Sequence, residues 1–125
     1  MRIATWNCFS GECRDRAAHP GLQEPDIVVL QECSRPTQPP TAQCHFFGPT
    51  ARGVGIVSRG PWTLEEGPTD PDLRWVYPVR VRGPRRFNLL AVWAHPEPNG
   101  CYVQCVHAGL TRYDAFLREP LDWIA

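Results

Sequence analysis

The runs MRIATWNC (residues 1–8) and PDIVVLQE (residues 25–32) decide the fold of this chain. Each is a short apolar run that ends in a polar residue, Asn7 in the first and Glu32 in the second. The segment between them, residues 14–23, is too long for a hairpin turn and suits a short helical crossover. A strand, a crossover and a second strand form a βαβ unit with parallel strands. We therefore expect Asn7 and Glu32 to lie together at the carboxyl edge of a sheet, where open α/β sheets bind ligands.

The rest of the chain has the pattern of short strands joined by proline-rich loops. Strands are predicted over residues 43–47, 53–58 and 62–64, and the glycines of the second indicate a close approach to a neighbour. A hairpin is predicted over residues 73–82 and 86–94 because apolar residues alternate along both segments.

The two strands of this hairpin differ in pattern. The first has one polar face, and Pro78 favours an edge position or a bulge. The second is largely apolar on both faces, which predicts a central strand covered on both sides. Apolar residues at spacings of three and four then predict one amphipathic helix over residues 102–119, which Pro120 ends. The residues of its apolar face are Val103, Val106, Leu110, Tyr113 and Leu117.

The order of these motifs resembles the endonuclease/exonuclease/phosphatase superfamily, which includes deoxyribonuclease I. Trp6-Asn7 after an N-terminal strand, and Pro25-Asp26-Ile27-Val28 running into Gln31-Glu32, carry the resemblance. Residues 47–57 and 89–95, followed by a helix, extend it along most of the chain. The resemblance implies an α/β (α+β) fold, a deoxyribonuclease I-like β-sandwich flanked by helices. It also implies hydrolysis of a phosphodiester or phosphomonoester, with Mg²⁺ or Mn²⁺ as cofactor and in-line attack by water.

The resemblance assigns roles to three residues. Glu32 would be the metal ligand, and a hard divalent cation does bind carboxylate oxygen. Asn7 would hydrogen-bond the scissile phosphate or join the metal site, since its amide is both donor and acceptor. His95 would stabilise the phosphate or protonate the leaving oxygen. From the residues alone, a solvated carboxylate, a turn asparagine and a loop histidine are the alternatives. Arg52 could reach a phosphate, but a solvated loop arginine is the simpler reading.

The family continues beyond such a helix into a strand ending Gly-Asp-x-Asn and later a Ser-Asp-His triplet, and this sequence contains neither. We therefore expect residues 1–125 to be the N-terminal half of one domain, with little or no turnover alone. The apolar runs 27–30 and 87–94 would then leave an uncovered sheet face, which predicts self-association or a complementing chain. The alternative function is a catalytically dead half-domain that acts as a binding or assembly partner.

Composition limits the partners and the cellular setting that can be expected for this chain. The formal net charge is zero, so no basic field indicates a nucleic-acid partner, although nucleic acid stays among the candidate phosphate-ester substrates. No apolar run has the length of a membrane span, and the N-terminus lacks the features of a signal peptide. The six cysteines are therefore expected to be reduced, in a cytoplasmic protein. Cys101, Cys105 and His107 are a weak metal candidate, because zinc needs about four ligands.

Overall fold

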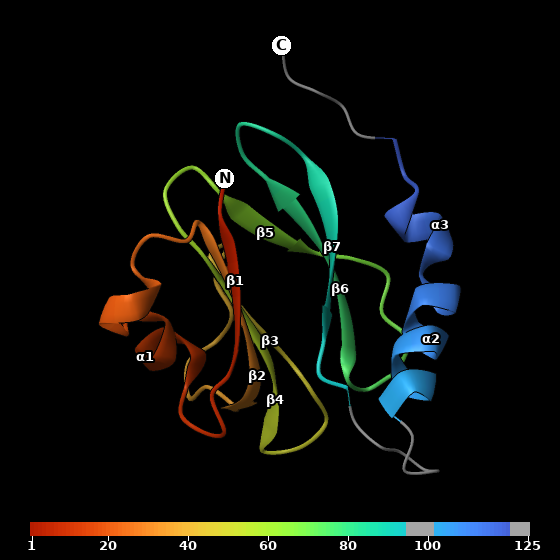
Figure 1. Ribbon diagram of the computed structural model, residues 1–125, viewed down its shortest axis with the longest axis horizontal. Coiled ribbons are helices and arrows are strands. Elements are labelled where there is room, and N and C mark those ends of the chain that lie inside the picture. Colours follow the sequence, from red (N-terminus) through yellow and green to blue (C-terminus); the bar gives the residue numbers. More distant parts are fainter. Residues whose placement is uncertain (95–101, 121–125) are drawn as a thin grey trace.

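The computed structural model describes residues 1–94 and 102–120, and it contains two β-sheets that pack face to face. The first sheet has the order β1-β2-β4-β3 and the second the order β5-β6-β7. Figure 1 shows α1 outside the first sheet, and α2 and α3 outside the second. The chain is thus a mixed α/β protein built in four layers. The strands are β1 (Ile3–Asn7), β2 (Ile27–Ser34), β3 (Cys44–Phe47), β4 (Arg52–Ser58), β5 (Thr63–Glu66), β6 (Val76–Arg82) and β7 (Phe87–Val92).

The predicted βαβ unit is present. β1 and β2 pair in parallel, from Ile3 opposite Ile27 to Asn7 opposite Gln31. The crossover contains α1 (Cys13–Ala17) and a 3₁₀ turn, Pro20–Leu22. The predicted end of the second run at Glu32 is wrong, because β2 runs on to Ser34 through a register shift against β4. That shift is a β-bulge, which bends a strand locally and re-aims its side chains.

Both faces of β2 are covered by the chain itself. Ile27 and Val29 face the second sheet, and Val28 and Leu30 face the layer that contains α1. All four are buried, and burial of each such side chain stabilises the fold by about 1.5–3 kcal/mol. The prediction of an uncovered apolar face on this run is therefore wrong, since the second sheet and α1 supply the two covering layers.

The hairpin strands occupy the opposite positions from those predicted. β6, which contains Pro78, is the central strand of its sheet, whereas β7 lies at the edge of that sheet in the described part of the chain. The Pro78 carbonyl accepts a hydrogen bond from the Gly67 amide, 3.0 Å away. In an antiparallel strand the backbone nitrogen and carbonyl of one residue point to the same neighbouring strand, so the Pro78 nitrogen faces the β5 side as its carbonyl does. Regular pairing with β5 stops one residue earlier, at Glu66 opposite Val79. The N–H that proline lacks therefore falls beyond the end of β5.

The predicted C-terminal helix is broken into α2 (Tyr102–Arg112) and α3 (Asp114–Leu117). Tyr113 leaves helical geometry, and its buried hydroxyl accepts a hydrogen bond from the Asp70 amide. The predicted apolar face is also partly wrong, because Leu110 is 49% exposed and Leu117 is 36% exposed.

Gly109 and Phe116 contact the sheet instead. A Cβ on Gly109 would lie only 3.0 Å from Val76, so the missing side chain lets the helix approach β6. Phe116 and Tyr113 form a buried cluster with Val76, against which Leu90 and Val92 of β7 pack. This cluster covers the outer face of β7, which the sequence pattern had left open. None of the helices in the described residues has the length and apolar character needed to span a membrane.

Candidate functional site

Asn7 and Glu32 lie together at the carboxyl ends of the parallel strands β1 and β2. The Asn7 side-chain amide Nδ2 donates a hydrogen bond of 2.9 Å to Oε1 of Glu32. Parallel pairing of Asn7 with Gln31 brings the two side chains to the same edge of the sheet, as the motif order predicts. The asparagine is exposed and the glutamate is half-buried, so the pair is open to solvent.

Glu32 has a strained backbone. Its φ angle is +58°, in the left-handed region that residues with a Cβ rarely adopt. It lies within the β2 bulge, between Leu30 and Cys33, where the register against β4 shifts. This conformation costs about 1–2 kcal/mol for a residue other than glycine. Such outliers cluster at functional sites because the surrounding structure must enforce them.

The Asn7 amide is held at both of its ends. Its Oδ1 accepts a hydrogen bond of 3.2 Å from the Phe9 backbone amide, while its Nδ2 donates to Glu32. The two contacts together fix which end of the amide faces the glutamate. Within the described residues, Oε2 of Glu32 has no hydrogen-bond partner. The carboxylate therefore presents one oriented oxygen to an incoming ligand.

Gln31 connects the site to the second sheet, and sequence reasoning assigned it no role. Its side-chain Nε2 donates to Oγ1 of Thr5 at 2.7 Å and to the Val92 carbonyl at 3.4 Å. The carboxyl end of β7 therefore lies beside the ends of β1 and β2. His95, predicted to act from the end of this third strand, lies outside the described residues. The sequence feature that could have indicated Gln31 is its position as a polar residue at the end of an apolar run, directly before Glu32.

A cation and an aromatic ring lie beside the pair. The guanidinium carbon of Arg52 is 4.9 Å from the centroid of the Phe9 ring, a cation–π contact worth about 0.5–1 kcal/mol at an exposed site. Phe9 is 68% exposed and has a φ angle of +66°. Arg52 is the first residue of β4 and pairs with Ser34 of β2, so its predicted loop position is wrong. Phe9 was missed, and the only signal for it was an aromatic residue directly after Asn7-Cys8.

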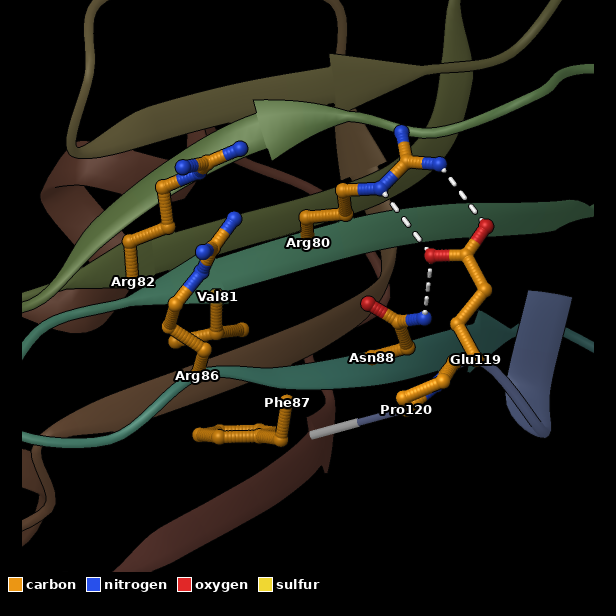
Figure 2. A pocket seen from close by; sticks show the side chains of 8 residues that line it. All are labelled: Arg80, Val81, Arg82, Arg86, Phe87, Asn88, Glu119 and Pro120. Carbon is orange, nitrogen blue, oxygen red and sulfur yellow. Dashed lines mark hydrogen bonds and ion pairs between the residues drawn. The ribbon is translucent and has the colours of Figure 1, made fainter. Parts of the chain in front are cut away.

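A second set of polar side chains lies at the other end of the second sheet (Figure 2). There, Nη2 of Arg80 lies 3.0 Å from Oε1 of Glu119, and Nδ2 of Asn88 donates to Oε2 at 3.0 Å. These hydrogen bonds lower the pKa of the Glu119 carboxyl below its ordinary value. Arg82 forms an ion pair of 2.8 Å with Glu65. Since its charges are paired, this group joins the end of the helical layer to β6 and β7 and offers no open reactive site.

The Asn7–Glu32 pair can be tested against the requirements of a divalent cation. Among the described residues, no three His, Cys, Asp or Glu side chains are placed to share a metal ion, and Cys101 lies outside those residues. Mg²⁺ commonly keeps several waters and uses one or two carboxylates together with substrate phosphates. A single oriented carboxylate fits that mode, and Arg52 lies on the ring of Phe9, which is close to Asn7 in the chain. Comparison with models of protein families, with curated proteins and with solved structures finds no match.

Proposed function

We propose that this chain carries a site for metal-dependent hydrolysis of a phosphate ester, centred on Glu32 and Asn7, on a deoxyribonuclease I-like fold. The observation that carries the proposal is the hydrogen bond between these two residues at the carboxyl ends of two parallel strands. The left-handed backbone of Glu32 supports it, because strain of this kind persists where function requires it. The layered pair of sheets with outer helices supports the fold, together with the motif resemblance.

In the proposed site Glu32 would hold Mg²⁺ or Mn²⁺ through its outward oxygen. The ion, when bound, supplies positive charge against the charge that develops on the phosphate oxygens during displacement. Asn7 fixes the orientation of the carboxylate, and its second N–H is available to a phosphate oxygen. Direct metal ligation by Asn7 stays a prediction.

Arg52 is proposed to contact the substrate phosphate. Its guanidinium suits bidentate phosphate contacts, and it lies on the Phe9 ring beside Asn7. The role of His95 as proton donor to the leaving oxygen rests on the resemblance. We propose a cytoplasmic, reducing setting, because all five cysteines in the described residues are free thiols.

The second candidate is a catalytically dead half-domain that assembles with another chain. The observation that favours it is the position of β7, which pairs only with β6 in the described residues although its sequence is largely apolar. A strand edge of this kind presents unpaired backbone groups to an incoming strand. Under this reading, association through the β7 edge replaces turnover.

The deciding experiment measures Mn²⁺ binding by electron paramagnetic resonance and Mg²⁺-dependent hydrolysis of bis(p-nitrophenyl) phosphate. Glu32→Gln, which keeps the size of the side chain, is compared with Glu66→Gln, an exposed carboxylate of β5. We expect Glu32→Gln to lose at least about tenfold in affinity, as even outer-shell changes do at metal sites. The control should bind normally.

The possible results separate the two candidates. Metal-dependent turnover that disappears in Glu32→Gln supports the hydrolase. Concentration-dependent dimerisation by analytical ultracentrifugation, without turnover or Mn²⁺ binding, supports the assembly partner. Equal Mn²⁺ affinity in the wild type and Glu32→Gln would remove Glu32 from the metal site and overturn the first proposal.

A further inference from the structure

Four cysteines gather in the core beneath α1. Cys8, Cys13, Cys33 and Cys44 are all buried and belong to the apolar cluster between α1 and the first sheet. They come from four different segments of the chain, so no spacing in the sequence indicates their meeting.

Two of these thiols are in direct contact. Sγ of Cys13 lies 3.1 Å from Sγ of Cys44, although 31 residues separate them. Cys13 is the first residue of α1 and Cys44 is the first residue of β3. A disulfide needs its sulfur atoms about 2 Å apart, so a shift of about 1 Å would join them.

The two cysteines differ in their access to a pocket. Cys44 lines a pocket of about 210 Å³ that opens beneath the proline-rich loop, whereas Cys13 is wholly buried behind it. Two arginines also line the pocket. Arg14 donates to the Pro39 carbonyl at 3.2 Å, and the Arg35 guanidinium carbon lies 4.9 Å from the Phe46 ring centroid. The pocket is thus positively charged, large enough for a small molecule, and has Cys44 in its wall.

The protonation states of the two thiols differ. The hydrogen bond from Cys13 lowers the pKa of Cys44 to about 7, helped by the nearby Arg14 charge and opposed by burial and Glu12. The same contact and burial raise the pKa of Cys13, so Cys13 holds its proton more tightly than Cys44 does. Burial raises the pKa of Cys33 to about 12. Cys44 is therefore the thiol of the pair that ionises more readily, and the thiolate is the reactive form of cysteine.

We propose that Cys44 and Cys13 form a hydroperoxide-reactive pair, in which Cys44 reacts through the arginine-lined pocket and Cys13 closes a disulfide with it. The substrate class is a small hydroperoxide, either hydrogen peroxide or an organic hydroperoxide. The site lies on the α1 side of the first sheet and uses neither Asn7 nor Glu32.

The two chemical steps balance. The Cys44 thiolate attacks the terminal oxygen of the hydroperoxide, the O–O bond breaks, and an S–O bond forms. The released alkoxide, or hydroxide, takes a proton from solvent, and Cys44 is left as a sulfenic acid. Cys13 then attacks that sulfur, the S–S bond forms, and the oxygen leaves as water with the Cys13 hydrogen. The peroxide gains two electrons and the two thiols lose them.

The test begins with the reduced wild-type chain and one equivalent of hydrogen peroxide under native conditions. Remaining thiols are alkylated and the peptides are mapped by mass spectrometry. We expect a cross-linked peptide containing Cys13 and Cys44 and the loss of two hydrogens from the intact mass. The more exposed Cys105 is the internal comparison, since accessibility alone would favour it.

Three variants separate the steps. Cys13→Ser should stop at the sulfenic acid, which dimedone traps on Cys44. Cys44→Ser should form no disulfide at Cys13, and Cys33→Ser, a buried thiol of the same cluster, should still form the Cys13–Cys44 bond. Circular dichroism checks that each variant is folded. The proposal is overturned if Cys105 is oxidised first while Cys13 and Cys44 of the wild type stay reduced, or if they oxidise only in denaturant.

Discussion

The Asn7 side chain donates a hydrogen bond of 2.9 Å to the Glu32 carboxylate across 25 residues of sequence. The contact depends on two features of the fold. Parallel pairing of β1 with β2 brings the strand ends together, and the bulge in β2 turns Glu32 toward the amide. Because the side-chain oxygen Oδ1 of Asn7 also accepts a hydrogen bond from the Phe9 backbone amide, the asparagine acts as a fixed support for the carboxylate.

The first prediction concerns that support. Asn7→Ala should weaken Mn²⁺ binding by about 10–100-fold while Glu32 is still present, because removal of a residue that orients a metal ligand has this effect. Electron paramagnetic resonance titration measures the affinity. Gln38→Ala, which removes an exposed amide from the proline-rich loop, is the matched control and should bind as the wild type does. An unchanged affinity in Asn7→Ala would show that the hydrogen bond does not support metal binding.

The second prediction uses the backbone strain at Glu32. Glycine adopts a φ of +58° without a steric penalty, whereas alanine does not. Glu32→Gly should therefore be more stable than Glu32→Ala by about 1 kcal/mol, because relief of strain exceeds the added chain entropy of glycine. Urea unfolding followed by tryptophan fluorescence measures the difference. Both variants lack the carboxylate and should lose Mn²⁺ binding equally, so bound metal does not affect the comparison. Equal stabilities would show that the left-handed conformation costs nothing.

The meeting of Asn7 and Glu32 could be predicted from the sequence, but the bulge at Glu32 and the contacts around the pair could not. Two apolar runs, each ending in a polar residue and separated by a crossover, determine that Asn7 and Glu32 meet. The bulge depends on how β2 and β4 shift against each other, and β4 is distant in the chain. The contact of Arg52 with Phe9 also needs that pairing, so no local pattern could reveal it.

The errors in the fold have a common origin in tertiary contacts. An apolar pattern on both faces of β7 indicates coverage on both sides, which is present, but it does not distinguish a central strand from an edge strand. The helix break at Tyr113 coincides with a hydrogen bond of its hydroxyl with the Asp70 amide, 43 residues away. The glycine pattern of β4 was more informative, because it correctly predicts a close neighbour.

The third prediction tests that close approach at Gly55. A Cβ placed there would lie 2.6 Å from Cβ of Cys13 and 2.7 Å from Sγ of Cys33. Gly55→Ala should therefore destabilise the fold by about 1–3 kcal/mol, the usual cost of overpacking a core. Gly21→Ala is the control, since its nearest neighbour would be the exposed His19 ring. Urea midpoints compare the two, and equal midpoints would mean that the cysteine cluster is loosely packed.

The fourth prediction is a fall in stability as the pH drops below the ordinary histidine pKa. His45 is half-buried and its Nδ1 lies 2.8 Å from the Tyr77 hydroxyl. Burial lowers the pKa of His45 below its ordinary value of 6.5, against the opposing charge of Glu66. Between the folded and unfolded pKa values only the unfolded chain binds the proton, so stability is fully present above 6.5 and decreases as the pH falls.

The measurement is the free energy of unfolding in urea at about pH 7 and about pH 5, a window in which histidine titrates. The slope from this one group should be positive and cannot exceed about 1.4 kcal/mol per pH unit. His45→Gln should flatten the slope, whereas His107→Gln, an exposed residue of α2, should leave it in place. A wild-type stability that rises as the pH falls would contradict the burial of a neutral imidazole, because a buried neutral base resists protonation only in the folded state.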